Sequence, residues 1–344
     1  MRGIHEELYN KFLHGLDNNH INSSSHKTTK TYPPMDEREL NERISSLSSK
    51  YKQQSTFVAI FMVIGICCTF YADLSESVVG ALVGIPLLII GVCFVTAAYK
   101  VKKELKCIVS NHIVRGVLSE KFELTTFMPG SHIGQNIIIA SGLFPQAGFA
   151  RGGWNRISGS DLVAGIYKGV RFNFSDLHLQ EERGSGKNRT VTTIFKGQWL
   201  TIEYKKELPA GVTLRARGGG KMRTHGVGKR AKSDIETENI EFNQKFQIQT
   251  RDPHTAFYVL TPHFMEYILR AKQRAGAQAH MNFGTRQVHI ALHNGRDLFE
   301  PTGKNLFATN NIATLKMQMQ WDVNYITNVI DELLLNENLF GKEG

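Results

Sequence analysis

The stretch QQSTFVAIFMVIGICCTFYA, residues 53–72, contains twenty residues and no charged side chain. At a rise of about 1.5 Å per residue, a helix of this length spans the roughly 30 Å of hydrocarbon in a bilayer. A second stretch, SVVGALVGIPLLIIGVCFVTAAY at 77–99, adds twenty-three uncharged residues. Neither stretch has the polar face that a surface helix of a soluble protein retains. The two stretches therefore predict a transmembrane hairpin.

The charges beside the two stretches predict how the hairpin is inserted. The connection DLSE at 73–76 has two acids and no base, whereas the outer flanks carry Lys50, Lys52, Lys100, Lys102, Lys103 and Lys106. Positively charged flanks stay in the cytoplasm. We therefore expect a multi-pass membrane protein with both termini in the cytoplasm. Gly80 and Gly84 form a GxxxG pattern, which leaves a homo-oligomer open.

Composition divides the chain into five parts. Residues 1–34 are polar and contain a Pro pair, which predicts a flexible segment, and residues 35–55 predict a short cytoplasmic helix. The hairpin occupies 56–99. A helical extension is expected over 100–128, because apolar side chains keep helical spacing at Val101, Leu105, Ile108, Val109, Ile113 and Val117. Residues 129–344 are expected to form a cytoplasmic domain.

Within that domain the apolar period changes to two, which is typical of strands. Apolar and polar residues alternate after the turns YKG (167–169) and FKGQW (195–199). The sequence GSGKNR (184–189) lies between two such strands and predicts a hairpin turn. A helix is predicted to begin after Thr261-Pro262 and to stop near Gly276. A second helix is predicted over residues 312–333, where apolar side chains line one face. The expected fold class is α+β: a two-helix transmembrane hairpin followed by a domain of antiparallel strands with packed helices.

A loop at 205–232 concentrates the basicity of the chain. It carries nine Lys or Arg and one acid, within a chain whose formal net charge is +10. Within it, residues 215–232 hold five glycines and lack large apolar residues, which predicts a solvated loop that we expect to contact anionic lipid headgroups. A loop without a partner, RNA and an acidic protein remain alternatives, and the absence of interleaved aromatic residues disfavours nucleic acid. The candidate contacts are Arg215, Arg217, Lys221, Arg223, Lys229, Arg230 and Lys232.

No catalytic or metal-binding pattern is recognisable. Each of the five GK dipeptides lacks the following Ser or Thr of a phosphate-binding loop, and His289 with His293 lies in a strand-like segment. The acids nearest glycine-rich turns are Asp161, Asp297 and Glu300, which could serve as general bases. No cofactor or metal is expected, and enzymatic activity is left open but disfavoured.

Several segments together resemble a bacterial family known as domain of unknown function 3137. They are SGLF (141–144), SGSDLVAGIYKGVRFNFSDL (158–177), FKG (195–197), EFNQKFQIQTRDPHTAFYVLTPHFMEYIL (241–269), and MNFGTRQVHIAL with DLFEP (297–301). The resemblance extends over about residues 50–302 and does not require the helix after 305. It implies a bacterial inner-membrane protein and assigns no catalytic or binding residue.

Two classes of function are compatible with these features. The first is a membrane-anchored binding or scaffolding module with an unidentified protein partner, since the β-rich domain lacks a catalytic pattern. The alternative is a membrane-bound hydrolase or transferase acting on lipid or envelope precursors, with Asp161, Asp297 or Glu300 in an assembled pocket. A transporter is disfavoured because the spans carry no charge.

Overall fold

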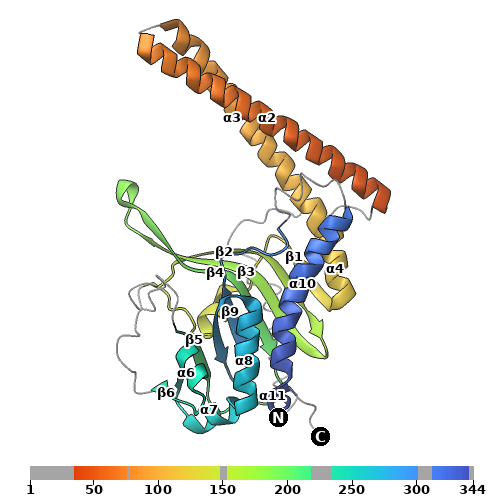
Figure 1. Ribbon diagram of the computed structural model, residues 1–344, viewed down its shortest axis with the longest axis vertical. Coiled ribbons are helices and arrows are strands. Elements are labelled where there is room, and N and C mark those ends of the chain that lie inside the picture. Colours follow the sequence, from red (N-terminus) through yellow and green to blue (C-terminus); the bar gives the residue numbers. More distant parts are fainter. Residues whose placement is uncertain (1–34, 76–77, 148–152, 218–233, 301–311, 341–344) are drawn as a thin grey trace.

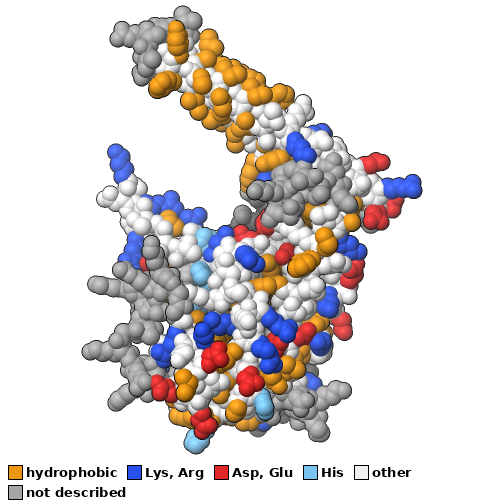
Figure 2. Space-filling view, viewed as in Figure 1, with side chains coloured by type: hydrophobic (Ala, Val, Ile, Leu, Met, Phe, Trp, Pro, Cys, Tyr) orange, Lys and Arg blue, Asp and Glu red, His pale blue; other side chains and the backbone are white. Residues whose placement is uncertain are grey.

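Two long helices, α2 (Glu37–Ser75) and α3 (Val78–Ile108), leave the domain together as a hairpin (Figure 1). The structure is a computed structural model that describes residues 35–75, 78–147, 153–217, 234–300 and 312–340. Both are long and apolar enough to cross a membrane, and only 6% and 17% of their apolar windows are buried. A core helix of a soluble protein would be mostly buried. Hydrophobic side chains instead cover the outside of the projecting hairpin (Figure 2). The expected pair of apolar helices is confirmed.

Glycines allow the two helices to approach closely. A Cβ atom added to Gly84 would lie 2.7 Å from Thr69 Cγ2, and one added to Gly65 would lie 2.8 Å from Leu88. Both distances are far below van der Waals contact, so a side chain at either position would force neighbouring atoms to shift. Gly84, half of the GxxxG pattern, thus serves the contact within the hairpin.

Both helices continue past their apolar windows into the main core of the domain. Leu40 and Ile44 of α2, and Leu105 and Ile108 of α3, are buried in that core. The short helix expected at 35–55 is therefore the first part of a continuous α2. A π-helical turn, η1 (Val109–Val114), and α4 (Arg115–Lys121) follow α3. The helix expected over 100–128 ends at Lys121, because residues 123–128 form a strand at the edge of the sheet.

One sheet of nine antiparallel strands organises the domain, in the order β1-β2-β3-β4-β9-β8-β5-β7-β6. Lys168 and Gly169 join β2 to β3 with φ of 50° and 77°, the left-handed values of a tight hairpin turn. The strands are β1 (Glu123–Met128), β2 (Arg156–Tyr167), β3 (Val170–Arg183), β4 (Thr190–Glu203), β5 (Val212–Ala216), β6 (Asp234–Ile235), β7 (Phe246–Thr250), β8 (Gln278–Phe283) and β9 (Gln287–His293).

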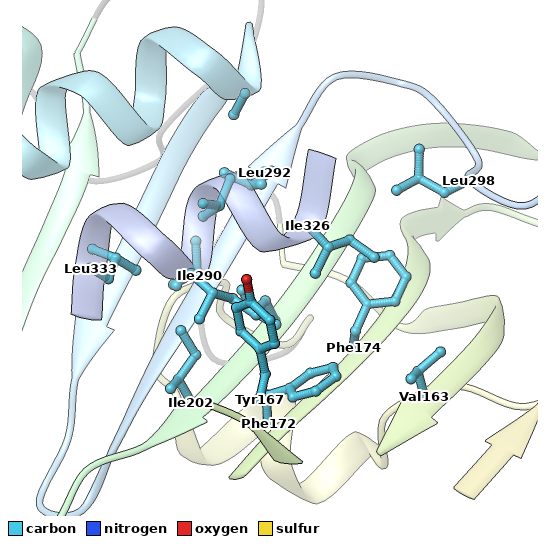
Figure 3. Close-up of a cluster of buried hydrophobic side chains, with 14 of the residues drawn as sticks. Val163, Tyr167, Phe172, Phe174, Ile202, Ile290, Leu292, Leu298, Ile326 and Leu333 are labelled. Atoms are coloured by element: carbon cyan, nitrogen blue, oxygen red, sulfur yellow. The ribbon is translucent and has the colours of Figure 1, made fainter. Parts of the chain in front are cut away.

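Helices cover one face of this sheet and bury the main core. Thr261 caps the start of α8 by accepting from the Phe264 N–H, and Gly276 ends it in the left-handed conformation, as the sequence predicted. Apolar side chains of α10 pack on β3, β4 and β9 (Figure 3). The helices on this face are α6 (Ile240–Lys245), α7 (Pro253–Val259), α8 (Pro262–Ala275) and α10 (Ile312–Leu334), and α11 (Glu337–Phe340) follows them.

A second, smaller core lies on the opposite face. Side chains alternate along a strand, so Leu200 belongs to the main core and its neighbour Trp199 to the second core. The segment before β2, with α5 (Gln135–Ala140), covers this face through Ile138 and Phe144. The domain is thus a sheet between two layers, and the sequence did not predict the second layer.

Candidate functional site

Charged side chains gather at the end of the sheet where α3 enters the domain. We call this group the junction cluster: Lys106, Asp161, Lys196, Asp297 and Glu300. Lys106 Nζ forms an ion pair with Glu300, and Lys196 Nζ lies 3.2 Å from Asp297 Oδ2. Three of the five, Asp161, Asp297 and Glu300, are the acids that the sequence singled out. The cluster links α3, β2, β4 and the segment after β9.

Asp161 is the most deeply buried acid of the cluster. It lies in an irregularity of β2 with φ of 59°, and it is fully buried. Burial raises the pKa of Asp161 to about 6, while the charge of Lys106 and the Ser160 hydroxyl oppose the rise. Neither carboxylate oxygen has a hydrogen-bond partner of normal geometry among the described residues. The carboxyl group therefore depends on Lys106 for much of its stabilisation.

A buried polar network adjoins the junction cluster and begins at Asp176 of β3. Its carboxylate accepts hydrogen bonds from Gln198 Nε2 at 3.0 Å and from the Leu298 N–H at 2.6 Å. Burial raises the pKa of Asp176 to about 8, although both hydrogen bonds act against the rise. Asp176 thus holds the segment after β9 against the middle of the sheet.

The network continues from Gln198 to helix α10. Asn294 Nδ2 donates to Gln198 Oε1 at 2.6 Å and to the Tyr325 hydroxyl at 3.0 Å. Asp322 of α10 accepts from the Phe299 N–H at 2.9 Å, and burial raises the pKa of Asp322 to about 6. Phe299 has φ of 54° and packs edge-to-face on Phe174. The segment after β9 is therefore fixed by hydrogen bonds to the buried Asp176 and the half-buried Asp322.

The hollow at this end of the sheet does not include the candidate acids. It has a volume of about 640 Å³ and is lined by Lys272, Gln278, His293 and Asn294 among others. Asp161 is fully buried, so a substrate in this hollow does not reach it. Within the described residues, no group of three or more His, Cys, Asp or Glu is arranged to hold a metal ion.

Only two of the seven predicted lipid-contacting residues fall in the described part of the chain. Residues 212–216 of the expected loop form strand β5 instead, because they pair with β7 and β8, and Arg215 is half-buried there. Its side chain donates to the carbonyl oxygens of Leu143 at 2.6 Å and Gly142 at 3.0 Å. Arg217 Nε donates to the Phe246 carbonyl at 3.1 Å and is exposed. The other five, Lys221, Arg223, Lys229, Arg230 and Lys232, lie outside the described residues. Lipid contact by this loop stays a prediction.

Sequence reasoning missed the centre of the polar network. Asp176 follows Phe172 and Phe174 at period two, which places an acid on the same inward face of β3 as two core aromatic residues. That break in an apolar alternation was a signal for a buried acid. Nothing local marked Asp322 or Asn294, because their partners lie far away in the sequence.

The comparisons with known proteins support the family resemblance. Residues 193–335 match the model described as "Protein of unknown function (DUF3137)". The match includes α10, contrary to the expectation that the last helix is not needed, and it begins within β4 rather than near residue 50. No curated protein matches the chain. A crystal structure of the mycobacterial trehalose monomycolate transport factor A, TtfA, has a TM-score of 0.26 and 10% identity, covering 50% of this chain and 75% of that one.

Proposed function

We propose that this chain, in which residues 193–335 form a segment of the DUF3137 family, is a membrane-anchored binding or scaffolding module of the bacterial inner membrane. The observation that carries the proposal is the continuity of α2 and α3 from their exposed apolar windows into the main core. A flexible linker would let the domain swing freely. Here the shared core and the ion pair of Lys106 with Glu300 fix the domain at the base of the hairpin.

The exposed surface of α10 supports a binding role for the domain. Met317 and Trp321 lie one helical turn apart and remain 53% and 72% exposed. Tryptophan and methionine are enriched in the centres of protein interfaces. An unidentified protein is therefore a proposed partner, together with the bilayer and the anionic headgroups proposed for the loop at 205–232.

The proposed orientation places both termini and the domain in the cytoplasm. We expect a green fluorescent protein fused after Gly344 to fluoresce, and alkaline phosphatase inserted within residues 73–76 to be active, since that enzyme folds only outside the cytoplasm. Alkaline extraction of the membranes should leave the chain in the pellet. Active phosphatase at residue 344 with an inactive insertion would reverse the orientation, and release by alkali would refute the membrane anchor.

A second candidate, a membrane-bound hydrolase or transferase, is favoured by the meeting of Asp161, Asp297 and Glu300 beside Lys106. The two candidates differ in the access that reagents have to Asp161. A catalytic acid must meet its substrate, whereas a coupling residue stays covered.

Carbodiimide labelling of the full chain in detergent, read by mass spectrometry, separates these candidates. We expect Asp297, whose side chain is 44% exposed, to react in the native protein. Asp161 should react only after unfolding, because it is fully buried. Native labelling of Asp161 at a rate close to that of Asp297 would favour the enzyme and count against the scaffold.

A further inference from the structure

A two-stranded arm extends beyond the sheet where β3 turns into β4. We call residues 181–192 the β3–β4 arm. Strand β2 pairs with β3 only as far as Gln180, and β9 pairs with β4 only from Gly197 onwards. The arm therefore has no neighbouring strand on either side within the described chain. Residues 183–193 are all exposed.

The arm has a defined shape despite this exposure. Asn155 fixes its base by exchanging two hydrogen bonds of 2.8 Å with the backbone of Glu182. Gly184 and Gly186 have φ of 75° and 56°, and η2 (Gly186–Asn188) closes the tip. An isolated two-stranded ribbon is only marginally stable in water. An arm of this kind is better explained by a contact that it makes than by the stability it adds.

The arm projects from the membrane-facing end of the domain. Next to its base, Lys196 of β4 pairs with Asp297, and Glu300 pairs with Lys106 of α3. Figure 1 shows the arm and the hairpin of α2 and α3 extending from the same end of the domain. The tip of the arm is therefore on the side of the domain where the membrane lies.

The arm is long enough to reach the membrane surface. From Lys106 to Lys100, the last charge before the apolar window, α3 rises by about 9 Å. From Lys196 to Thr190, β4 extends by about 20 Å, so that even an inclination of 60° leaves a rise of about 10 Å. At that inclination the tip comes level with Lys100, where the headgroups begin.

Cations occupy the tip. Arg189 and Arg156 both pair with Glu182, and Arg183 pairs with Glu181. Lys187 stands at the end of the turn and has no ion-pair partner among the described residues. Within residues 181–192, Arg183, Lys187 and Arg189 against Glu181 and Glu182 leave the arm with a net charge of +1, and blue side chains mark it in Figure 2.

We propose that the tip of the β3–β4 arm binds the phosphates of anionic lipid headgroups in the leaflet next to the domain. The inference rests on the proposed membrane anchoring and adds a second, built point of contact. Cations attract anionic lipid only within about 8 Å of the surface at physiological salt, and the arm brings them to that distance. The hairpin fixes the domain relative to α2 and α3, and contact at the arm adds a second point that restrains the tilt of the domain against the bilayer.

The test uses the full chain in vesicles. In a variant whose Cys67, Cys68, Cys93 and Cys107 are replaced by Ala, a spin label is placed at the tip by Ser185→Cys. A matched control carries it at Thr285→Cys, an exposed position in the turn between β8 and β9 at the opposite end of β4. Relaxation by a lipid whose headgroup chelates nickel reports contact with the surface. The vesicles contain either phosphatidylethanolamine with phosphatidylglycerol or phosphatidylcholine alone.

We expect strong relaxation at position 185 and none at position 285. The relaxation at position 185 should be larger in the anionic vesicles. Lys187→Gln should weaken tip contact in the anionic vesicles about fivefold, the effect of one charge near such a surface. Equal relaxation at both positions would overturn the proposal. Contact with a protein partner would then be the remaining explanation for the arm. Relaxation at position 185 that is the same in both kinds of vesicle and unchanged by Lys187→Gln would overturn the phosphate contact. Release of the protein from the vesicles by alkali would instead refute the membrane anchoring.

Discussion

Replacing Trp199 by Ala is expected to lower the free energy of unfolding of the domain by about 3–5 kcal/mol, the range for a large aromatic residue in a well-packed core. Trp199 is fully buried near the centre of the second core. Its ring lies 5.9 Å from the ring of Phe195 and 6.0 Å from that of Phe144. Removing it would leave a cavity between β4 and the covering segment. Urea unfolding of the full chain in detergent, followed by circular dichroism, measures the loss.

Trp199→Phe is the matched control. The Trp199 Nε1–H is buried without a hydrogen-bond partner among the described residues. Phenylalanine removes this unsatisfied donor while keeping most of the apolar area, so we expect a cost below about 1.5 kcal/mol. Equal losses for the Ala and Phe variants, or no loss for Ala, would show that the covering segment does not pack on β4 as described.

The second prediction is that the domain loses stability as the pH rises from 6.5 to 8. Burial raises the pKa of Asp176 to about 8, so the folded state keeps a proton that the unfolded state has already lost. The stabilisation from this group is complete below the unfolded pKa of 3.8 and disappears as the pH passes 8. The steepest loss is about 1.4 kcal/mol per pH unit.

Other shifted groups contribute below this window. Burial lowers the pKa values of His280 and His289 to about 4, so their contribution is lost as the pH falls below 6.5. Asp161 and Asp322, with pKa values raised by burial to about 6, add to the slope mainly below pH 6.5. Of these five groups, Asp176 alone dominates between pH 6.5 and 8.

Asp176→Asn should flatten the slope in that window, whereas Asp297→Asn, at a partly exposed position, should preserve it. The measurement is the urea midpoint of the full chain in detergent at a series of pH values. An unchanged slope in Asp176→Asn, or a wild-type midpoint that rises with pH, would contradict the assignment of a buried, protonated carboxyl group.

Features with a local cause could be predicted from the sequence. The two membrane helices follow from long runs without charge, α8 follows from the cap at Thr261 and the stop at Gly276, and the β2–β3 hairpin follows from Lys168-Gly169. In each case the residues that determine the element lie inside it or beside it. The α+β class followed from the change of period after residue 130.

The strand β1 and the site depend on contacts between distant parts of the chain. Residues 123–128 become a strand because they pair with β2 about forty positions later, although the preceding apolar spacing favours a helix. Lys106 and Glu300 are 194 positions apart, and Asp176 and Leu298 are 122 apart. Sequence reasoning could name Asp161, Asp297 and Glu300 from their neighbouring glycines, but no local pattern places them beside Lys106.

The π-helical turn η1 sets how far the domain is rotated about the axis of α3. Its N–H to C=O bonds span five residues, as in the bond from Arg115 N–H to Ser110, so the turn accommodates one residue more than an α-helical turn. Each residue of an α-helix adds about 100° of rotation. Losing one residue from 109–114 would therefore turn the domain by about a quarter of a circle relative to α3. The number of residues in this one turn thus sets the rotational orientation of the domain about α3.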